Sequence, residues 1–339
     1  MRVNILFDFV DGPWGGGNQF LKSLRNRLVR EGIYETDSNV ADVILFNSHH
    51  RIDEVLDHKY RYPEKLYIHR VDGPVFLIRG KDRDIDGNIF LINQLVADGT
   101  VFQSNWSRMR CIAQGMKPPK YQAVIFNAPD PEIFWPRPRS PIYGRKIRLI
   151  ATSWSANEKK GFDIYRYLDE SLDFDRYEMS FVGNAPCGFK NIRYVAPIES
   201  AKLADELRRN DIFITGSLDD PCSNSLIEAL HCGLPAVARD SGGHPEIIGG
   251  GGALFKDTTD VIGAIARVAD NRDKYAKSIA TDDIINVSGK YVGFFRDILR
   301  TGKSDGERNN IVSKSSFLWA KCRLKSRNVA KALQAFGRP

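Results

Sequence analysis

The clearest structural signal in the sequence is the run Asp219-Asp220-Pro221-Cys222-Ser223-Asn224-Ser225-Leu226-Ile227-Glu228-Ala229-Leu230-His231-Cys232-Gly233-Leu234-Pro235. It follows a short apolar stretch at residues 212–215, which predicts a buried strand that ends in a loop. Ser223 and Asn224 both favour the capping position at the start of a helix. The run therefore predicts a strand, a loop and a helix in succession, the repeating unit of α/β proteins.

The loop and the first turn of this helix have the properties of a ligand site. Free backbone N–H groups and the positive end of the helix dipole suit a phosphate group. Asp220 stands just before the helix and Glu228 lies about one turn inside it, so the two acids can flank one ligand. A second corner follows at residues 241–246, where Gly242 and Gly243 allow a backbone to approach a ligand closely.

Short β-branched runs alternate with amphipathic helical periods from one end of the chain to the other. Several of these runs are apolar on both sides, which is typical of parallel strands covered on both faces. The first series of predicted strands lies at residues 3–7, 42–46, 65–69, 100–103 and 123–126. The second series lies at residues 147–152, 179–183, 192–195, 212–215, 235–238 and 253–255.

The two series are separated by residues 129–141, in which five of thirteen residues are proline. Such a segment continues neither a helix nor a central strand, so it predicts a linker. We expect an amino-terminal domain at residues 1–142, with the linker at about 129–142, a second domain at 143–302 and a tail at 303–339. The predicted fold class is α/β, with two Rossmann-like doubly wound domains that face a central cleft, plus a basic C-terminal helix.

Composition narrows the class of protein. Of 339 residues, 42% are hydrophobic and 27% charged, which excludes a wholly disordered chain. No apolar run approaches the ~18 residues of a membrane-spanning helix, and Asp8 interrupts the N-terminus before a signal peptide could form, so we expect a cytoplasmic protein. The five cysteines are widely spaced and match no metal-ligand or disulfide pattern.

The net charge of +7 comes entirely from the tail, because residues 301–339 contain nine basic and two acidic residues. On a helical wheel for residues 314–338, one sector is apolar and the opposite side basic. The apolar sector contains Leu318, Cys322, Val329, Leu333 and Phe336, and the basic side Arg323, Arg327, Lys331 and Arg338. Such a helix can lie on an anionic membrane surface, or it can dock on the body of the protein. Nucleic acid is not expected, since no basic, aromatic-rich groove accompanies the charge.

The run from Asp220 to Glu228, the following stretch to Pro235 and the corner from Gly242 to Glu246 resemble a known signature. It is the donor-site signature of retaining glycosyltransferases with the GT-B fold, and most closely of glycosyltransferase family 4, the group 1 transferases. Weaker similarity extends to about residue 302. It includes the glycine loop at residues 15–17, the linker around residues 126–136 and the Lys160-Gly161 pair.

The resemblance implies a role for each matching residue. Glu228 would accept the ribose hydroxyls of a nucleotide, and Asp220, where the family usually has Glu, would contact the transferring sugar. Lys160 would neutralise the diphosphate leaving group. The family usually has an Arg at the position of Ser155, so Lys159 or helix N-termini are expected to compensate. The donor side would further include Ser223, Asn224, Ser225, Gly16, Gly17, Gly242 and Gly243.

In the first domain, the resemblance assigns His69, at the end of a predicted strand, to the donor sugar. Arg70 and Asp72 would then face the acceptor, unless they simply pair with each other. The overlapping D-x-D triplets at residues 82–86 lie in a polar, glycine-flanked stretch that we interpret as a surface loop rather than a metal site. No metal and no cofactor is expected beyond a nucleotide-diphosphate sugar as substrate.

The sequence thus predicts a cytoplasmic, peripherally membrane-associated glycosyltransferase. It would move a hexose-type sugar, with retention of configuration, from a nucleotide diphosphate to a lipid-linked saccharide or glycolipid acceptor in surface polysaccharide or glycolipid synthesis. One alternative is a non-catalytic GT-B protein that binds a nucleotide or a glycan. Another is a nucleotide-sugar epimerase, which would isomerise its donor without an acceptor.

Overall fold

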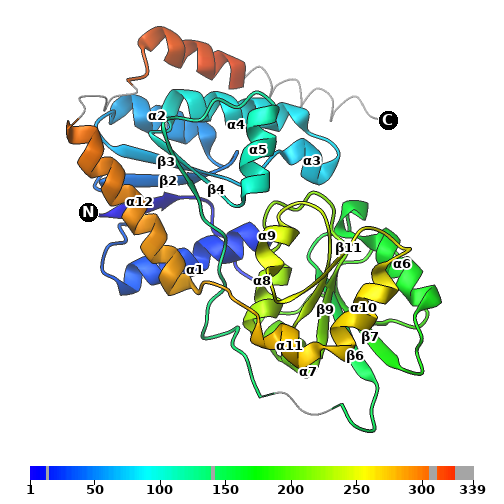
Figure 1. The fold of residues 1–339 in the computed structure, drawn as a ribbon. Helices are drawn as coiled ribbons and strands as arrows, with labels where there is room; N and C mark the ends of the chain where they lie inside the picture. The colour runs from blue at the N-terminus through cyan, green and yellow to red at the C-terminus, as the bar shows by residue number, and fades with distance from the viewer. Residues whose placement is uncertain (13–14, 139–141, 305–310, 325–339) are drawn as a thin grey trace.

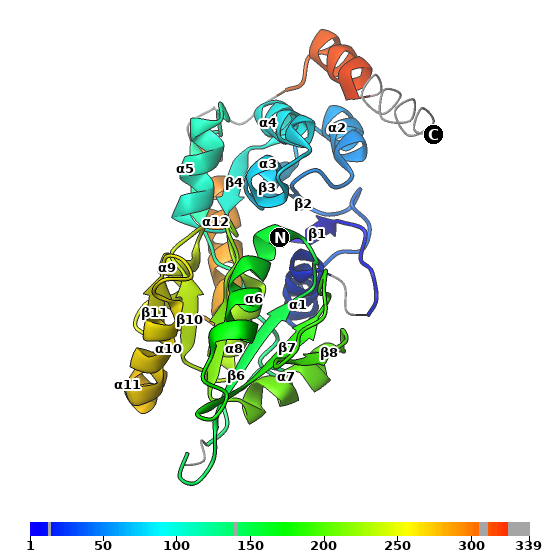
Figure 2. The same cartoon turned by 90° about the vertical axis from the view of Figure 1, so that its right-hand side faces the viewer.

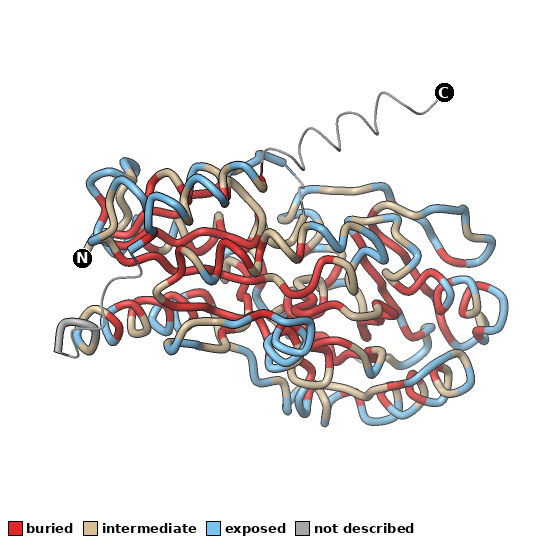
Figure 3. Tube along the Cα trace, turned by 90° about the horizontal axis from the view of Figure 1, so that it is seen from above, coloured by how far each residue is buried: buried red, intermediate tan, exposed pale blue. Residues whose placement is uncertain are grey.

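The computed structural model describes residues 1–12, 15–138, 142–304 and 311–324, and it consists of two α/β domains with parallel sheets (Figure 1). All eleven predicted strands are present, each within two residues of its expected bounds. In both domains the central strands are buried and the helices expose one face, so each sheet is the centre of its own core (Figure 3).

The first sheet has the strand order β1-β2-β3-β4-β5. Its strands are β1 (Val3–Leu6), β2 (Val43–Asn47), β3 (Leu66–Val71), β4 (Gly99–Phe102) and β5 (Tyr121–Val124). Its helices are α1 (Gly16–Arg30), α2 (Ile52–Arg61), α3 (Val75–Arg79), α4 (Arg83–Val96) and α5 (Asn105–Ala113). Tyr34 forms a parallel bridge to Val3 on the edge of β1 away from β2. The direction in which successive strands are added to the sheet therefore reverses at β1. As a result α1 covers one face of the sheet, and α2 and α4 cover the other.

The second sheet has the order β11-β10-β9-β6-β7-β8, that of a dinucleotide-binding sheet. Its strands are β6 (Ile147–Ser153), β7 (Tyr177–Gly183), β8 (Arg193–Val195), β9 (Ile212–Thr215), β10 (Ala236–Arg239) and β11 (Gly252–Phe255). Its helical segments are η1 (Glu158–Lys160), α6 (Phe162–Ser171), α7 (Ser200–Arg209), α8 (Asn224–His231), α9 (His244–Ile248), α10 (Val261–Asp270) and α11 (Arg272–Lys277). The order reverses between β6 and β9, and the carboxyl ends of these strands are where such sheets bind ligands.

Helix α12 (Ile284–Ser304) follows the second domain in sequence but packs on the first. It lies beside α1, and its buried residues belong to the same core as β1, β2 and β3 (Figures 1 and 2). Those residues are Ile284, Val287, Tyr291, Val292, Phe295 and Ile298. The predicted second domain at 143–302 therefore includes a helix that folds with the first. Periodicity shows that α12 has an apolar face, but not which sheet that face covers.

The tail forms a helix at residues 314–324 that docks on α2. The ring of Phe317 stacks on Tyr60 at 4.3 Å, and the Lys321 ammonium lies 2.7 Å from the Asp57 carboxylate. The docked face differs from the predicted apolar sector, because Leu318 is 52% exposed. The rest of the predicted helix, residues 325–338, lies outside the described residues. Within the described chain, no helix is both long enough and apolar enough to cross a bilayer.

Candidate functional site

A cavity of about 400 Å³ lies between the two domains, at the carboxyl ends of both sheets. The glycine loop before α1, the loop after β6 and the start of α8 all contribute to its lining. Of the predicted site residues, eight line it: Gly16, Gly17, Asp72, Lys160, Asp220, Asn224, Ser225 and Glu228. The residues that were expected to act together in the second domain are therefore close together in space.

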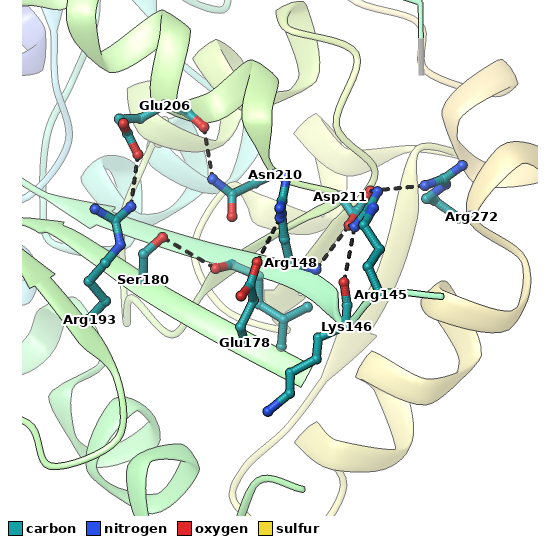
Figure 4. Close-up of polar contacts among 11 residues, drawn as sticks. Arg145, Lys146, Arg148, Glu178, Ser180, Arg193, Glu206, Asn210, Asp211 and Arg272 are labelled. Carbon is teal, nitrogen blue, oxygen red and sulfur yellow. Dashed lines mark hydrogen bonds and ion pairs between the residues drawn. The ribbon is translucent and has the colours of Figure 1, made fainter. Parts of the chain in front are cut away.

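A larger depression of about 680 Å³ lies at the opposite, amino-terminal ends of β6 and β7. Its arginines and glutamates are paired with one another, as Figure 4 shows for Arg148 with Glu178 and for Arg193 with Glu206. The nearby Asp211 carboxylate is bound by two arginines. Since parallel sheets bind ligands at their carboxyl ends and no predicted site residue lies here, the cavity between the domains is the candidate site.

Asp220 and Lys160 form an ion pair inside the cavity, with 2.8 Å between Lys160 Nζ and Asp220 Oδ2. The backbone N–H of Cys222 also donates to the Asp220 carboxylate, at 3.2 Å. Burial by itself would raise the pKa of Asp220, but the charges of Lys160 and His244 and these hydrogen bonds outweigh it, so its pKa is lowered. The site thus maintains an ionised carboxylate next to a cation.

Gly242 and Gly243 support the Asp220 loop from behind and do not line the cavity. Gly243 N donates to the Asp220 carbonyl at 2.8 Å. A Cβ atom on Gly242 would lie 2.2 Å from the same carbonyl oxygen, and the residue has φ +65°. Close packing against this loop requires glycine at both positions. The two glycines were predicted to contact the ligand, but they do not line the cavity.

Glu228 points into the cavity from the second turn of α8. Its carboxylate has no hydrogen bond or ion pair with any residue that the structure describes. Desolvation by burial raises its pKa to about 8 from an ordinary 4.5. An unpaired carboxyl group in such a place lacks hydrogen-bond donors, and a ligand with hydroxyl groups would supply them.

The start of α8 meets the first domain directly. Asn224 Oδ1 accepts from Asn127 Nδ2 at 3.0 Å, and a Cβ atom on Gly16 would lie 2.1 Å from Asn224 Nδ2. A glycine is therefore needed for the start of α1 to approach α8. Ser223 does not line the cavity: it is buried and caps α8, with its Oγ accepting from Leu226 N at 3.4 Å.

His69 lies in the core of the first domain and not in the cavity. Its ring stacks on Phe46 at 4.3 Å and its Nε2 is 3.0 Å from the Ser48 carbonyl oxygen. Burial lowers its pKa to about 4, so the ring is neutral at physiological pH. The histidine that lines the cavity is His49, which sequence reasoning missed. It follows a strand that was predicted, and its position at the carboxyl end of that strand was the available signal.

Arg70 and Asp72 pair with each other, as the alternative interpretation held. Arg70 is fully buried, and its guanidinium also donates to Asn127 Oδ1 at 2.7 Å. Only Asp72 lines the cavity. Burial would raise the pKa of Asp72, but Arg70 and hydrogen bonds from Asn47 and Ser48 lower it, so the carboxylate stays ionised.

The D-x-D stretch is not a surface loop. α4 begins at Arg83, and Asp86 is a buried residue of its first turn. The Asp86 carboxylate accepts from Val75 N at 2.6 Å and from Phe76 N at 3.0 Å, so it caps the short helix α3. Within the described ranges, no group of three or more His, Cys, Asp or Glu side chains is placed to hold a metal ion.

Comparison with known sequences places part of the chain in a family model. The model described as "Glycosyl transferases group 1" matches residues 176–271, which include Asp220, Glu228 and the glycine corner. A search of the curated proteins finds no match to this sequence.

Solved structures share the fold over most of the chain. Sucrose-phosphate synthase from Thermosynechococcus elongatus has a TM-score of 0.67 at 11% identity, with 89% of this chain and 100% of that chain covered. HepE from Anabaena, in complex with UDP, has a TM-score of 0.68 at 14% identity, with coverage of 88% and 100%. The apo form of the lipopolysaccharide outer core galactosyltransferase WaaB has a TM-score of 0.63 at 12% identity, with coverage of 88% and 99%. The chain has the GT-B fold.

Proposed function

We propose that this protein is a glycosyltransferase that moves a hexose-type sugar from a nucleotide diphosphate to a saccharide acceptor. One observation carries the proposal. The Lys160–Asp220 pair, the start of α8 and the unpaired Glu228 carboxylate line one cavity between the domains. Asp220 and Glu228 also lie in the segment that matches the glycosyltransferase model. HepE was solved with UDP, UDP-glucose, and UDP with glucose, which supports a nucleotide-sugar donor.

The chemistry follows from where the charges lie. Glu228 accepts the two vicinal hydroxyls of the ribose, and the N-terminal turn of α8 receives the diphosphate. Lys160 neutralises the negative charge that grows on the leaving phosphate as the glycosidic bond breaks. Asp220 places its carboxylate beside the sugar carbon, where positive charge develops. Since these groups belong to the protein, we propose that the reaction needs no metal, and full activity in the presence of EDTA is the expected result.

We further propose that transfer retains the anomeric configuration and that family 4 is the class to which the enzyme is related. The support is the spacing of Asp220, Glu228 and the glycine corner in the sequence. NMR of the first product formed distinguishes retention from inversion. Asp72 and His49, which line the first-domain side of the cavity, are proposed to face the acceptor.

The acceptor is proposed to be lipid-linked and the enzyme to work at the cytoplasmic surface of a membrane. The support is an exposed part of the tail helix: Leu318 and Trp319 are 52% and 53% exposed, and the Arg323 guanidinium lies 5.4 Å from the Trp319 ring centre. Sedimentation with phosphatidylglycerol vesicles, but not with phosphatidylcholine vesicles, is expected and should be reduced in Leu318→Asp/Trp319→Ser. Equal sedimentation of this variant and the wild type would refute the role of the helix.

The first experiment is calorimetric titration of UDP, GDP and ADP into the wild type and Glu228→Gln. One diphosphate should bind, and the variant should bind it at least tenfold more weakly, since hydrogen bonds to a charged group contribute about 1.5–3 kcal/mol. Glu170→Gln is the matched control, because Glu170 is an exposed carboxylate on α6 away from the cavity. No binding of any diphosphate by the wild type would overturn the proposal. Binding without sugar transfer would favour the non-catalytic alternative, and isomerisation of the donor alone would favour the epimerase.

A further inference from the structure

The cavity has few cations for a ligand that carries a diphosphate. Its described lining residues include one lysine, Lys160, and one arginine, Arg79. Lys160 is already paired with Asp220 at 2.8 Å. Arg79 has one ion pair among the described residues, with Asp82 at 3.9 Å, and its side chain is 46% exposed. Arg79 is thus the cation with more freedom to take a new partner.

Lys159, the residue expected to compensate for Ser155, is directed elsewhere. Its Nζ donates to the Leu77 carbonyl at 2.5 Å and lies 3.0 Å from Asp219 Oδ2. Ser155 lines the cavity and Lys159 does not. The loop after β6 therefore presents a small neutral side chain at the position where the family resemblance expects a guanidinium.

The same loop fixes the position of Arg79. Lys159 holds the carbonyl of Leu77, and Asn157 Nδ2 donates to the Arg79 carbonyl at 3.4 Å. Asn157 N in turn donates to Ser155 Oγ at 3.2 Å. The last turn of α3, in the first domain, is therefore bound to the loop of the second domain that contains Ser155, and both Arg79 and Ser155 line the cavity.

We infer that Arg79 binds the diphosphate of the donor, in place of the basic residue that Ser155 replaces. A guanidinium can donate two parallel hydrogen bonds to one phosphate, which suits this task better than a single ammonium. The inference rests on the proposed function. It adds that the diphosphate is held from both sides of the cleft, by Lys160 of the second domain and by Arg79 of the first.

The test compares Arg79→Ala with the wild type in calorimetric titrations. The probes are whichever of UDP, GDP and ADP binds the wild type, and the matching nucleoside monophosphate. The variant should lose at least tenfold in affinity for the diphosphate and less than threefold for the monophosphate. Arg79→Ala/Ser155→Arg should regain most of the loss. Arg61→Ala, which removes an exposed arginine at the end of α2, is the charge-matched control and should bind like the wild type.

The contact between α3 and the second domain uses the backbone carbonyl of Arg79, so truncation of the side chain leaves that contact in place. Equal losses for the diphosphate and the monophosphate, or no loss at all, would overturn the role of Arg79 while Glu228→Gln still reports on the proposed function. If the wild type binds no diphosphate, both fail. If Arg79→Ala is selectively weakened and the double variant is rescued, the inference holds.

Discussion

Nucleotide binding should remove a proton from Glu228, because the free protein holds this carboxyl group where its pKa is raised to about 8. If ribose hydroxyls donate to the carboxylate, its pKa in the complex should return toward the ordinary 4.5. A shift of that size corresponds to at most about 5 kcal/mol, and less in practice because part of the group meets solvent. The ligand binds the ionised form, so affinity should rise as the pH rises.

The expected size follows from the fraction of Glu228 that is ionised. Below the raised pKa, each pH unit changes this fraction about tenfold, so affinity should rise about 100-fold from pH 6 to pH 9 and level off above pH 8. At pH 7 each binding event should release about 0.9 proton. Calorimetry in two buffers with different ionisation heats measures this release directly.

Glu228→Gln is the control, since it keeps the shape of the side chain and removes the titration. The ionisation of the terminal phosphate is common to both proteins, so the difference between them isolates Glu228. An affinity that does not depend on pH, or the same dependence in the variant, would show that Glu228 does not change its protonation on binding. The interpretation that the buried, unpaired Glu228 carboxylate is the binding site for the ribose hydroxyls would then be wrong.

Three further predictions follow from the packing of the site and the core. Asp220→Asn should lower the turnover rate at least 100-fold. Its binding of the diphosphate should be unchanged or tighter, because Lys160 loses its ion-pair partner at 2.8 Å. Steady-state kinetics measure the first effect and calorimetric titration the second. Gly242→Ala should lower the melting temperature more than Gly144→Ala, since both have positive φ but only Gly242 would place its Cβ against the Asp220 carbonyl. Equal shifts in calorimetric melting would contradict the proposed close packing. Phe295→Ala should lower the free energy of unfolding by about 3–5 kcal/mol, because Phe295 is fully buried in the core of the first sheet. Amide hydrogen exchange should increase most in that sheet.

Local sequence determined the elements and the main features of the donor side. Each predicted strand was present because a β-branched run bounded by turn residues is encoded by neighbours along the chain. Asp220 and Glu228 could be predicted to lie at one site because Asp220 is in the loop just before the short helix α8, which contains Glu228. The two doubly wound domains likewise followed from the order of strands and helices.

The tertiary structure decided everything that depended on which surface meets which. His69 lies within β3 and His49 lies just after β2, and only the packing shows that the first is covered by α4 while the second lines the cavity. The sequence shows that helix α12 has an apolar face, but only the structure shows that this face packs on the first sheet, beside α1. Ser155 indicated a missing charge, while only the approach of α3 to the β6 loop brings Arg79 into the lining of the same cavity. Contacts between residues far apart in the sequence leave no periodic signal in it. The sequence pattern therefore predicts the strands and helices, whereas their packing in the folded core determines which of them are neighbours.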